Sequence, residues 1–453
     1  MRLTRREALV GAGAAVLGGG IYELVDRLAS TPPARALAEK LPPEQHVLES
    51  VRVVRDNGVE VLVPPLHHEV VTATVRARDL KSAQHELEEV LTALDRAYQP
   101  TPAGLGFTVA WGLPYFRRHV AKPAKRYLPR DLRAKKGALL DARRFPSDPG
   151  ETVLEQNEVA VLLRSDRLDH IKDAHRKLFS DLELFRVTSI RRGFAGGGFD
   201  GKRSLPKQMA LAAGIPGADL IPETAELFLG FTSTQRANLG PARIANFETL
   251  GFVLTPEGYF RGGTHMHLSH IEEDLEAWYL NFSFREQVDT VFRPGLKVKR
   301  GIQTVRQGAQ DVATERQLVQ DFHRRGRIGH SQAIQPASRL QADRLGEDGT
   351  LYKKGTAIPQ RADFNTLDNP FAFPVESGAG PTAGVHFVVF NPTSDDFERG
   401  RLAMDGNLPG GTKLRFQPRS RGQGINSVLR TTHRQNFLVP PRAHRSFPLA
   451  ELL

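Results

Sequence analysis

Strand and helix patterns follow one another in a fixed order between residues 68 and 191, and this order constrains the fold most. Residues 68–76 alternate apolar and polar side chains, which is typical of a half-buried strand. Asp79 can cap the segment that follows, where leucine and alanine recur at helical spacing as far as Leu94. Three more strands are predicted at residues 104–113, 158–164 and 185–191, and a second helix at residues 168–182. The order β-α-β-β-α-β predicts a ferredoxin-like unit.

A second block of the same kind begins near residue 225. Its strands are predicted at residues 225–231, 264–271, 385–391 and 436–439, with a helix over residues 272–292 and a shorter helix from Ser394. The insertion at residues 294–383 is too long for a structureless connection and is a favoured place for function. We therefore predict an α+β protein of two packed ferredoxin-like units, at residues 66–224 and 225–453. A chain of 453 residues is long enough for two cores.

The composition excludes several classes of protein. With 40% hydrophobic and 25% charged residues the chain is globular rather than disordered. It contains no cysteine, which excludes disulfides, thiolate zinc sites, cysteine nucleophiles and thiolate-ligated haem or iron–sulfur clusters. Any metal must therefore be held by His, Asp, Glu or Tyr, and the chain has 15 histidines.

Residues 1–38 have the features of an export signal. Arg5 and Arg6 precede an uncharged run over residues 8–22, which is too short and too rich in glycine for a membrane span of about 20 apolar residues. Ala36 and Ala38 have the spacing of the small residues at a cleavage site, and paired arginines indicate the twin-arginine route. A retained anchor helix is the alternative. We expect a periplasmic or extracellular protein with no membrane span after processing, in which residues 39–65 form a linker or strap.

The net charge of +11 suits a nucleic acid, an anionic surface or an acidic ligand. Basic residues gather at residues 117–118, 122–136 and 323–327, and clustered cations bind phosphates without sequence preference. Aromatic residues are not interleaved with them and no nucleic-acid recognition motif occurs. We therefore expect a solvated basic face and no nucleic-acid partner.

Three histidine-containing features compete for a site. His265 and His267 would share one face of a strand, and that spacing can hold zinc or copper if further ligands converge. His67 and His68 would point to opposite faces. His330 lies in the insertion, in the stretch Gly-His-Ser-Gln.

Several stretches resemble those of the dye-decolourising (DyP-type) haem peroxidases, from about His68 to the end of the chain. They are residues 262–264, 271–278, 284–287, 384–390 and 437–441, and His330 stands where the family keeps its proximal haem histidine. The resemblance implies two packed ferredoxin-like units, a haem b cofactor, and a peroxidase that reduces hydrogen peroxide while it oxidises a small organic donor. Exported members of the family that use the twin-arginine route are familiar.

The resemblance assigns His330 to the haem iron as a neutral imidazole ligand. Cleavage of the peroxide O–O bond then needs a group that moves a proton between the oxygens and a fixed cation that stabilises the developing charge. The family uses an Asp in a Gly-x-x-Asp-Gly motif and an Arg after the proximal histidine. Arg361 is the candidate for the cation and for a contact with the haem.

Two positions compete for the distal acid–base residue. Residues 197–201 match the motif and place Asp200 there, but Asp200 lies 62 residues before Gly262, farther than in the family. Residues 230–234 stand at the better spacing, with Ser233 in place of the aspartate. A neutral hydroxyl is a poor general base near neutral pH, so Ser233 would act through a water that it holds. We favour the Ser233 alignment and keep Asp200, reaching the pocket from a loop, as the alternative.

A haem peroxidase is the first of three functions that these residues allow. The second is a haem-binding protein of the same fold with little peroxidase activity, which the replaced distal carboxylate favours. The third is a zinc or copper protein that uses His265 and His267. A homo-oligomer is compatible with each of them.

Overall fold

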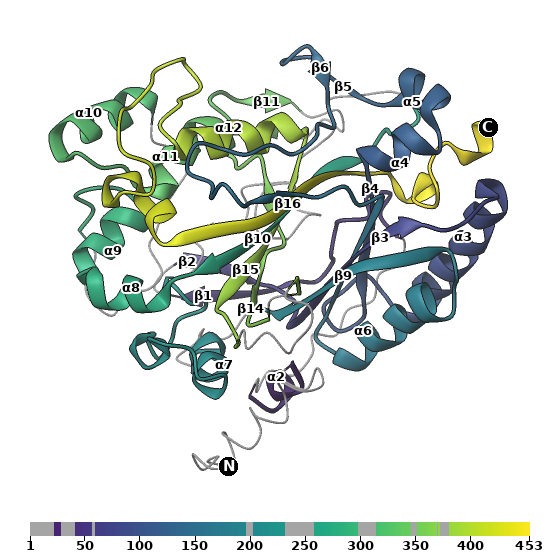
Figure 1. The fold of residues 1–453 in the computed structure, drawn as a ribbon, viewed down its shortest axis with the longest axis horizontal. Helices are drawn as coiled ribbons and strands as arrows, with labels where there is room; N and C mark the ends of the chain where they lie inside the picture. Colours follow the sequence, from purple (N-terminus) through teal and green to yellow (C-terminus); the bar gives the residue numbers. More distant parts are fainter. Residues whose placement is uncertain are drawn as a thin grey trace.

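The computed structural model describes residues 22–28, 41–56, 59–195, 203–231, 258–297, 314–345, 351–368, 370–371 and 380–453. Within these ranges the chain forms two ferredoxin-like units, as the sequence predicts (Figure 1). No helix in the described ranges is long and apolar enough to cross a membrane.

The first unit follows the predicted order. Its elements are β3 (His67–Val75), α3 (Leu80–Ala97), β4 (Gly106–Gly112), β8 (Val159–Ser165), α6 (Leu168–His175), which continues as the π-helical η2 (Arg176–Ser180), and β9 (Phe185–Phe194). The carboxylate of Asp79 accepts hydrogen bonds from the backbone N–H groups of Lys81 and Ser82, as expected of a helix cap. The strands pair antiparallel in the order β9-β3-β8-β4.

The second unit repeats this arrangement with added helices. Its elements are β10 (Thr264–Glu273), α8 (Leu275–Asn281), α9 (Phe284–Val291), α10 (Glu315–Arg325), α11 (His330–Ser338), β13 (Gln360–Arg361), β14 (Phe364–Thr366), β15 (Gly384–Asn391), α12 (Ser394–Met404) and β16 (Leu429–Val439). The strand order is β16-β10-β15-β14, which matches the order of the first unit strand for strand.

The edges of the two sheets pair with each other and close a barrel. β9 meets β14 through the pair Phe194 and Asn365, and β4 meets β16 through Trp111 and Leu438 with one further pair. Closure leaves no long unpaired edge on either sheet. Figure 1 shows the strands in the middle, with α3 and α6 on the right and α8, α9 and α10 on the left.

Three apolar clusters follow from this layering. The first packs α3 and α6 on the outer face of the first sheet, around Trp111 and Leu91. The second lies around Trp278 among the helices of the second unit. The third fills the barrel, with side chains such as Val70, Leu162 and Phe390 that come from both sheets. Because side chains alternate along a strand, each strand supplies the barrel with one set of residues and the outer face with the other.

The remaining elements lie between or around the two units. They are α2 (Glu23–Leu28), β1 (Arg52–Asp56), β2 (Val59–Val63), α4 (Leu113–Arg118), α5 (Ala121–Tyr127), β5 (Arg130–Asp131), β6 (Lys136–Gly137), β7 (Val153–Leu154), α7 (Leu205–Ala212), η3 (Ala218–Leu220), β11 (Arg344–Leu345), β12 (Leu351–Tyr352), η6 (Arg421–Ser427), η7 (Arg442–His444) and η8 (Ala450–Leu452). The basic stretch 122–136, predicted as a loop, thus contains most of α5.

The strand predicted at residues 225–231 is wrong. The segment is buried, but it forms turns, and Gly230 has a φ of 86°. Side chains satisfy its carbonyl groups in place of a neighbouring strand: Trp278 Nε1 donates to the Leu229 oxygen at 3.0 Å and the Tyr279 hydroxyl to the Phe228 oxygen at 2.6 Å. The second unit therefore begins its strand order at β10.

The single helix predicted at residues 272–292 is two helices, α8 and α9. Ser283 starts the second one: its hydroxyl accepts from the backbone N–H of Glu286, and the Glu286 carboxylate accepts from the Ser283 N–H. This capping box is visible in the sequence as Ser-Phe-Arg-Glu, and it marks a new helix start inside an apolar pattern that continues across it.

The segments before the first unit are partly described. Most of the predicted export signal, residues 1–38, lies outside the described residues. Within it, Val25 of α2 and the preceding Tyr22 belong to the second cluster. In the predicted linker, residues 41–48 lie against the barrel, where the Gln45 amide contacts the backbone of Val109 and the Pro440 oxygen.

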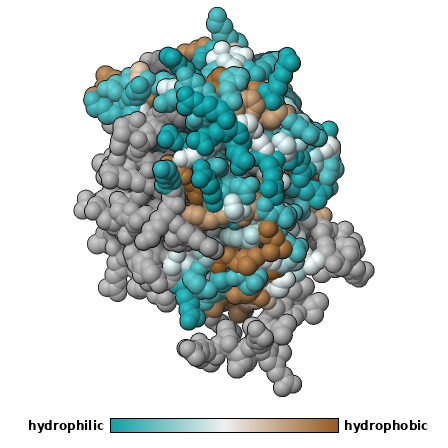
Figure 2. All heavy atoms as spheres, turned by 90° about the vertical axis from the view of Figure 1, so that its left-hand side faces the viewer, coloured by the Kyte–Doolittle hydropathy of each residue, from teal (hydrophilic) through white to brown (hydrophobic). Residues whose placement is uncertain are grey.

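On the side of the molecule that carries α7 to α10, the described residues at the surface are mostly hydrophilic (Figure 2). Apolar side chains gather in its lower half, where Figure 1 places α7 and α8. Leu211, Leu220 and Leu280 of this region are 49%, 42% and 63% exposed. Leu211 and Leu280 adjoin in sequence Ala210, a residue of the second cluster, and Tyr279, which packs against that cluster.

We expect Gly193→Ala to weaken barrel closure. A Cβ at Gly193 would collide with the Asn365 carbonyl oxygen and the Phe364 ring, at the one junction that joins β9 to β14. Forced overpacking of this kind costs about 1–3 kcal/mol, measurable as a lower free energy of unfolding in urea. Gly150→Ala is the matched control, since nothing lies within 4 Å of a Cβ there. Equal stability of the two variants would contradict the role given to this junction.

Candidate functional site

A cavity of about 270 Å³ lies between the outer face of the second sheet and the helices that cover it. Its sheet wall comes from β10, β13, β14, β15 and β16, and its helix wall from α11 and α12. Apolar side chains such as Phe231, Phe387 and Ile425 form most of the lining. Polar and charged side chains, among them His330, Arg361 and Asp363, converge on this apolar surface, as they do in ligand sites.

His330 stands on the helix wall, as the first residue of α11. Gly329 precedes it, and a Cβ there would collide with the Phe292 backbone, so the glycine lets the start of α11 approach the end of α9. Burial, and then the charges of Arg361 and Arg401, lower the pKa of His330 to about 4. The imidazole is therefore neutral at physiological pH, the form that ligates a metal. Its Nδ1 is buried with no hydrogen-bond partner among the described residues.

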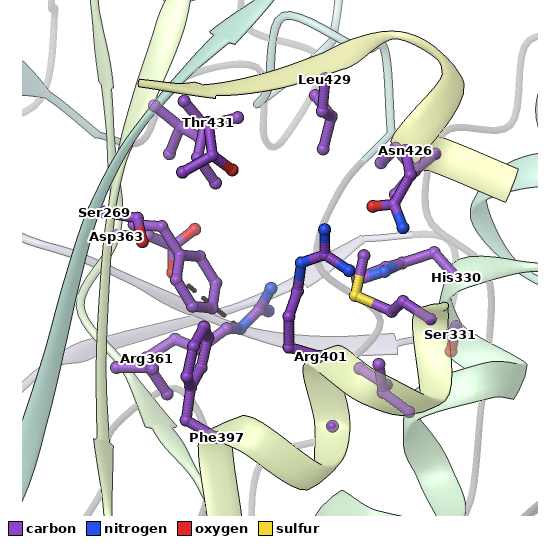
Figure 3. Close-up of a pocket in the computed structure, with 18 of the residues that line it drawn as sticks. Ser269, His330, Ser331, Arg361, Asp363, Phe397, Arg401, Asn426, Leu429 and Thr431 are labelled. Carbon is purple, nitrogen blue, oxygen red and sulfur yellow. Dashed lines mark ion pairs between the residues drawn. The ribbon is translucent and has the colours of Figure 1, made fainter. Parts of the chain in front are cut away.

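Arg361 and Asp363 stand on the sheet wall. Along this stretch Arg361, Asp363 and Asn365 line the cavity, whereas Ala362 and Phe364 point into the barrel. Arg361 Nε lies 4.0 Å from Asp363 Oδ1. Figure 3 shows these two residues across the cavity from His330, with the guanidinium of Arg361 directed toward its centre.

Glu273 adds a second carboxyl group to the sheet wall. It ends β10, two residues after Ile271 and four after Ser269, and all three line the cavity. Its Oε2 is buried and has no hydrogen-bond partner among the residues that the structure describes. Burial, with a smaller contribution from the nearby Asp363 charge, raises the pKa of Glu273 from 4.5 to about 8. The group therefore holds a proton near neutral pH.

A network of buried charges closes the cavity beside α12. Arg434 and Arg401 both reach Asp148 Oδ1, at 2.8 and 3.2 Å, and Arg401 also pairs with Asp405 at 2.8 Å. Burial lowers the pKa of Arg434 to about 10, so it remains a cation. Figure 3 shows the Arg401 side chain crossing the cavity toward His330 and Asn426.

The structure brings two of the four predicted site residues together. His330 and Arg361 line the same cavity although 31 positions separate them. Asp200 and Ser233, the two candidates for the distal acid–base residue, lie outside the described residues. Phe231, the last described residue before Ser233, lines the cavity.

His265 and His267 share the outer face of β10, as predicted, but their ring nitrogens are largely engaged. His267 Nδ1 lies 2.6 Å from Asn436 Oδ1 and its Nε2 lies 2.7 Å from Ser269 Oγ, while His265 Nδ1 lies 2.8 Å from the Pro392 oxygen. In the part of the chain that the structure describes, no group of three or more candidate ligands could hold a metal ion. This arrangement does not support the zinc or copper alternative, because both ring nitrogens of His267 are used within the fold.

The architecture is that of the DyP-type peroxidases. One similar structure is a putative DyP-type peroxidase from Shewanella oneidensis, with a TM-score of 0.50 and 14% identity over 84% of this chain and 94% of that one. Another is a variant of DypB from Rhodococcus jostii RHA1 in complex with heme, with a TM-score of 0.50 and 14% identity over 85% and 96% of the two chains. At this identity the likeness shows the fold.

The chain belongs to the family of unknown function DUF7405, whose model matches residues 65–441. No curated protein matches the sequence. The family match covers both ferredoxin-like units and the whole of the insertion that carries His330.

The polar residues of the cavity that could not be assigned from the sequence include Asp363, Glu273 and Arg401. A signal existed for Asp363, because the alternation Arg-Ala-Asp-Phe-Asn at residues 361–365 places three polar groups on one face. Glu273 falls within the helix predicted at residues 272–292. In the structure it ends β10 on the same face as Ser269, and helices cover this face and bury the carboxyl group.

We expect Glu273→Gln to change how stability depends on pH. The folded pKa of about 8 exceeds the ordinary value of 4.5, so this carboxyl contributes stability that is present below pH 4.5 and lost as the pH rises through 8. Glutamine does not ionise, so the wild type should lose stability relative to the variant between pH 5 and pH 8. Urea unfolding across this range measures the difference, with Glu276→Gln on the exposed side of α8 as the control. Parallel pH curves for Glu273→Gln and the wild type would contradict the assigned pKa.

Proposed function

We propose that this protein is a haem-dependent peroxidase that reduces hydrogen peroxide and oxidises a small organic donor. The observation that carries the proposal is the placement of a neutral histidine, His330, across an apolar cavity from Arg361 and Asp363. The DyP-type fold supports it, since one protein of similar fold was solved in complex with heme.

The residues that line the cavity fit haem b. His330 supplies an imidazole that burial keeps neutral, and a neutral imidazole is the ligand that haem iron takes. Apolar side chains such as Phe387 and Ile425 suit the macrocycle. Arg401 and Arg434 also line the cavity and would bind the propionates through charge-assisted hydrogen bonds.

Haem, when bound to His330, would supply the redox chemistry of peroxide reduction. The chain itself would supply the proton transfer and the charge stabilisation. Asp363 would take a proton from one peroxide oxygen and return it to the other, with Glu273 as a neighbouring carboxyl that holds a proton near neutral pH. The Arg361 guanidinium would stabilise negative charge on the leaving oxygen. The predicted Asp200 and Ser233 remain alternative partners for the proton.

A haem-binding protein with little peroxidase activity is the second candidate. The observation that favours it is the Arg361–Asp363 pair, with 4.0 Å between Nε and Oδ1, because it ties together two groups that peroxide cleavage uses separately. Haem binding is common to both candidates, and only the reaction with peroxide separates them.

We expect the purified full-length protein to bind haem in a one-to-one ratio and to give a Soret band. His330→Ala should shift the band and weaken haem binding at least tenfold, because the axial ligand is lost. Titration with haem, followed by absorbance, measures both effects. His323→Ala on the exposed side of α10 is the control. A Soret band that His330→Ala leaves unchanged would overturn the ligand assignment.

We expect the haem-loaded protein to oxidise a dye donor when peroxide is added. Asp363→Asn should lower kcat/KM for peroxide by about 10²–10⁴-fold if it transfers the proton, and Arg361→Leu by about 10²–10³-fold. Glu273→Gln reports the contribution of the second carboxyl. Arg285→Leu, at an exposed position on α9, is the control. If the haem-loaded wild type does not oxidise the donor when peroxide is added, the protein binds haem without peroxidase activity. If only Asp200 or Ser233 variants lose activity, the proton transfer belongs to those residues and not to Asp363.

A further inference from the structure

A polar cluster lies inside the barrel, on the opposite face of the strands from the cavity. Its members are His46, His68, Arg164 and Gln360, and each is at most 2% exposed. His68 shares its face of β3 with Val70, and Arg164 shares its face of β8 with Leu162, both of which belong to the barrel core. His68 and Arg164 are direct partners in the β3–β8 register.

Arg164 is a buried cation without an anion. One of its nitrogens, Nη2, donates to the His46 carbonyl oxygen at 2.9 Å, whereas Nε and Nη1 are buried with no partner in the described structure. Burial alone lowers its pKa to about 9, and no carboxylate of the described residues acts against this shift. The side chain is still charged at neutral pH, and an uncompensated buried charge is costly.

The polar groups next to Arg164 also lack hydrogen-bond partners among the described residues. Both ring nitrogens of His46 and both of His68 are buried without hydrogen-bond partners among the described residues, and so is the Gln360 Oε1. The Gln360 amide nitrogen lies 3.3 Å from the same His46 oxygen that Arg164 contacts. Burial, with the Arg164 charge, lowers the pKa of His46 to about 3 and that of His68 well below its ordinary value. Each imidazole is therefore neutral and has one N–H to donate.

Three other arginines of this protein are buried to a similar extent, and each of them forms an ion pair with a carboxylate. Arg191, Arg434 and Arg445 are as deeply buried as Arg164, and each meets a carboxylate at 2.6–2.8 Å. Arg191 even lies in the same barrel, paired with Glu155. Arg164 is the exception among them, and buried polar groups in folded proteins are satisfied by protein, ordered water or a bound ion.

We propose that the cluster of His46, His68, Arg164 and Gln360 binds a small monovalent inorganic anion of the chloride class inside the barrel. Water would leave the Arg164 charge uncompensated, whereas an anion compensates it and accepts hydrogen bonds from Arg164 Nε and Nη1 and from the imidazole N–H groups. The occupant is small because apolar side chains surround the cluster: Phe364 stacks on His68 with ring centroids 4.9 Å apart, and the Phe390 ring lies 5.1 Å from that of His46.

Bromide replaces chloride and scatters anomalously, so a crystal of the full-length protein grown in sodium bromide tests the site directly. We expect an anomalous peak within hydrogen-bond distance of Arg164 that is absent from crystals of Arg164→Met. Density of water strength with no anomalous signal would show that water alone fills the cluster and would overturn the proposal. The readout involves no haem, so its failure is separate from any failure of the peroxidase.

Thermal unfolding in solution tests the same site without a crystal. At constant ionic strength, chloride in place of gluconate should raise the Tm of the wild type in a saturable way, by about 2 °C or more at concentrations well above Kd. Arg164→Met should abolish this response. Arg445→Met, which removes a buried arginine that has its own carboxylates, should lower the Tm and keep the response. The same chloride response in Arg164→Met as in the wild type would refute the site.

Two further variants test the anion site if Arg164→Met does not fold. His46→Leu keeps Arg164 and removes one donor, so it should fold and bind chloride at least tenfold more weakly in the same assay. Arg164→Lys, which keeps a cation of different shape, should retain a weakened response. An unchanged chloride affinity in both variants would place the anion elsewhere.

Discussion

Pairing between the edges of the two sheets is the interaction on which the rest of this structure depends. Each ferredoxin-like unit alone would expose two unpaired edges, and a barrel forms because β9 meets β14 and β4 meets β16. Closure divides the strands of the second unit between two environments. Their inner face packs in the barrel, and their outer face becomes the wall of a cavity once α11 and α12 cover it.

The elements that the sequence predicts well are those whose pattern is local. α3 has a cap at Asp79 and a regular apolar face, β3 alternates apolar and polar side chains, and β8 is a short continuous apolar run. The positions of all three could therefore be predicted within a residue or two. The segment at residues 225–231 has the same apolar character as a strand, yet it forms turns because Trp278 and Tyr279 supply its hydrogen bonds. Those partners lie about 50 residues away, and no local pattern contains them.

The site was predictable to a similar extent. His330 and Arg361 could be proposed from a family resemblance, and the structure brings them to one cavity. Glu273 could not be proposed, because its chemistry depends on burial beneath helices and on the Asp363 charge rather than on its neighbours in sequence. Arg164 is comparable: in the sequence it ends an apolar strand as an ordinary solvated arginine would, and only closure of the barrel buries it.

The short segment that carries Arg361 supplies side chains to both the barrel and the cavity. Its length therefore decides which of its side chains face the barrel and which face the cavity. Gln360, Ala362 and Phe364 point into the barrel, and Arg361, Asp363 and Asn365 point into the cavity. Inserting or deleting a single residue before position 360 would exchange the two sets, because the side-chain period of a strand is two. Charged groups would then enter the barrel while aromatic and amide groups faced the cavity. A substitution in this segment therefore acts on one interior at a time, whereas a change in its length would disturb the cavity and the barrel together.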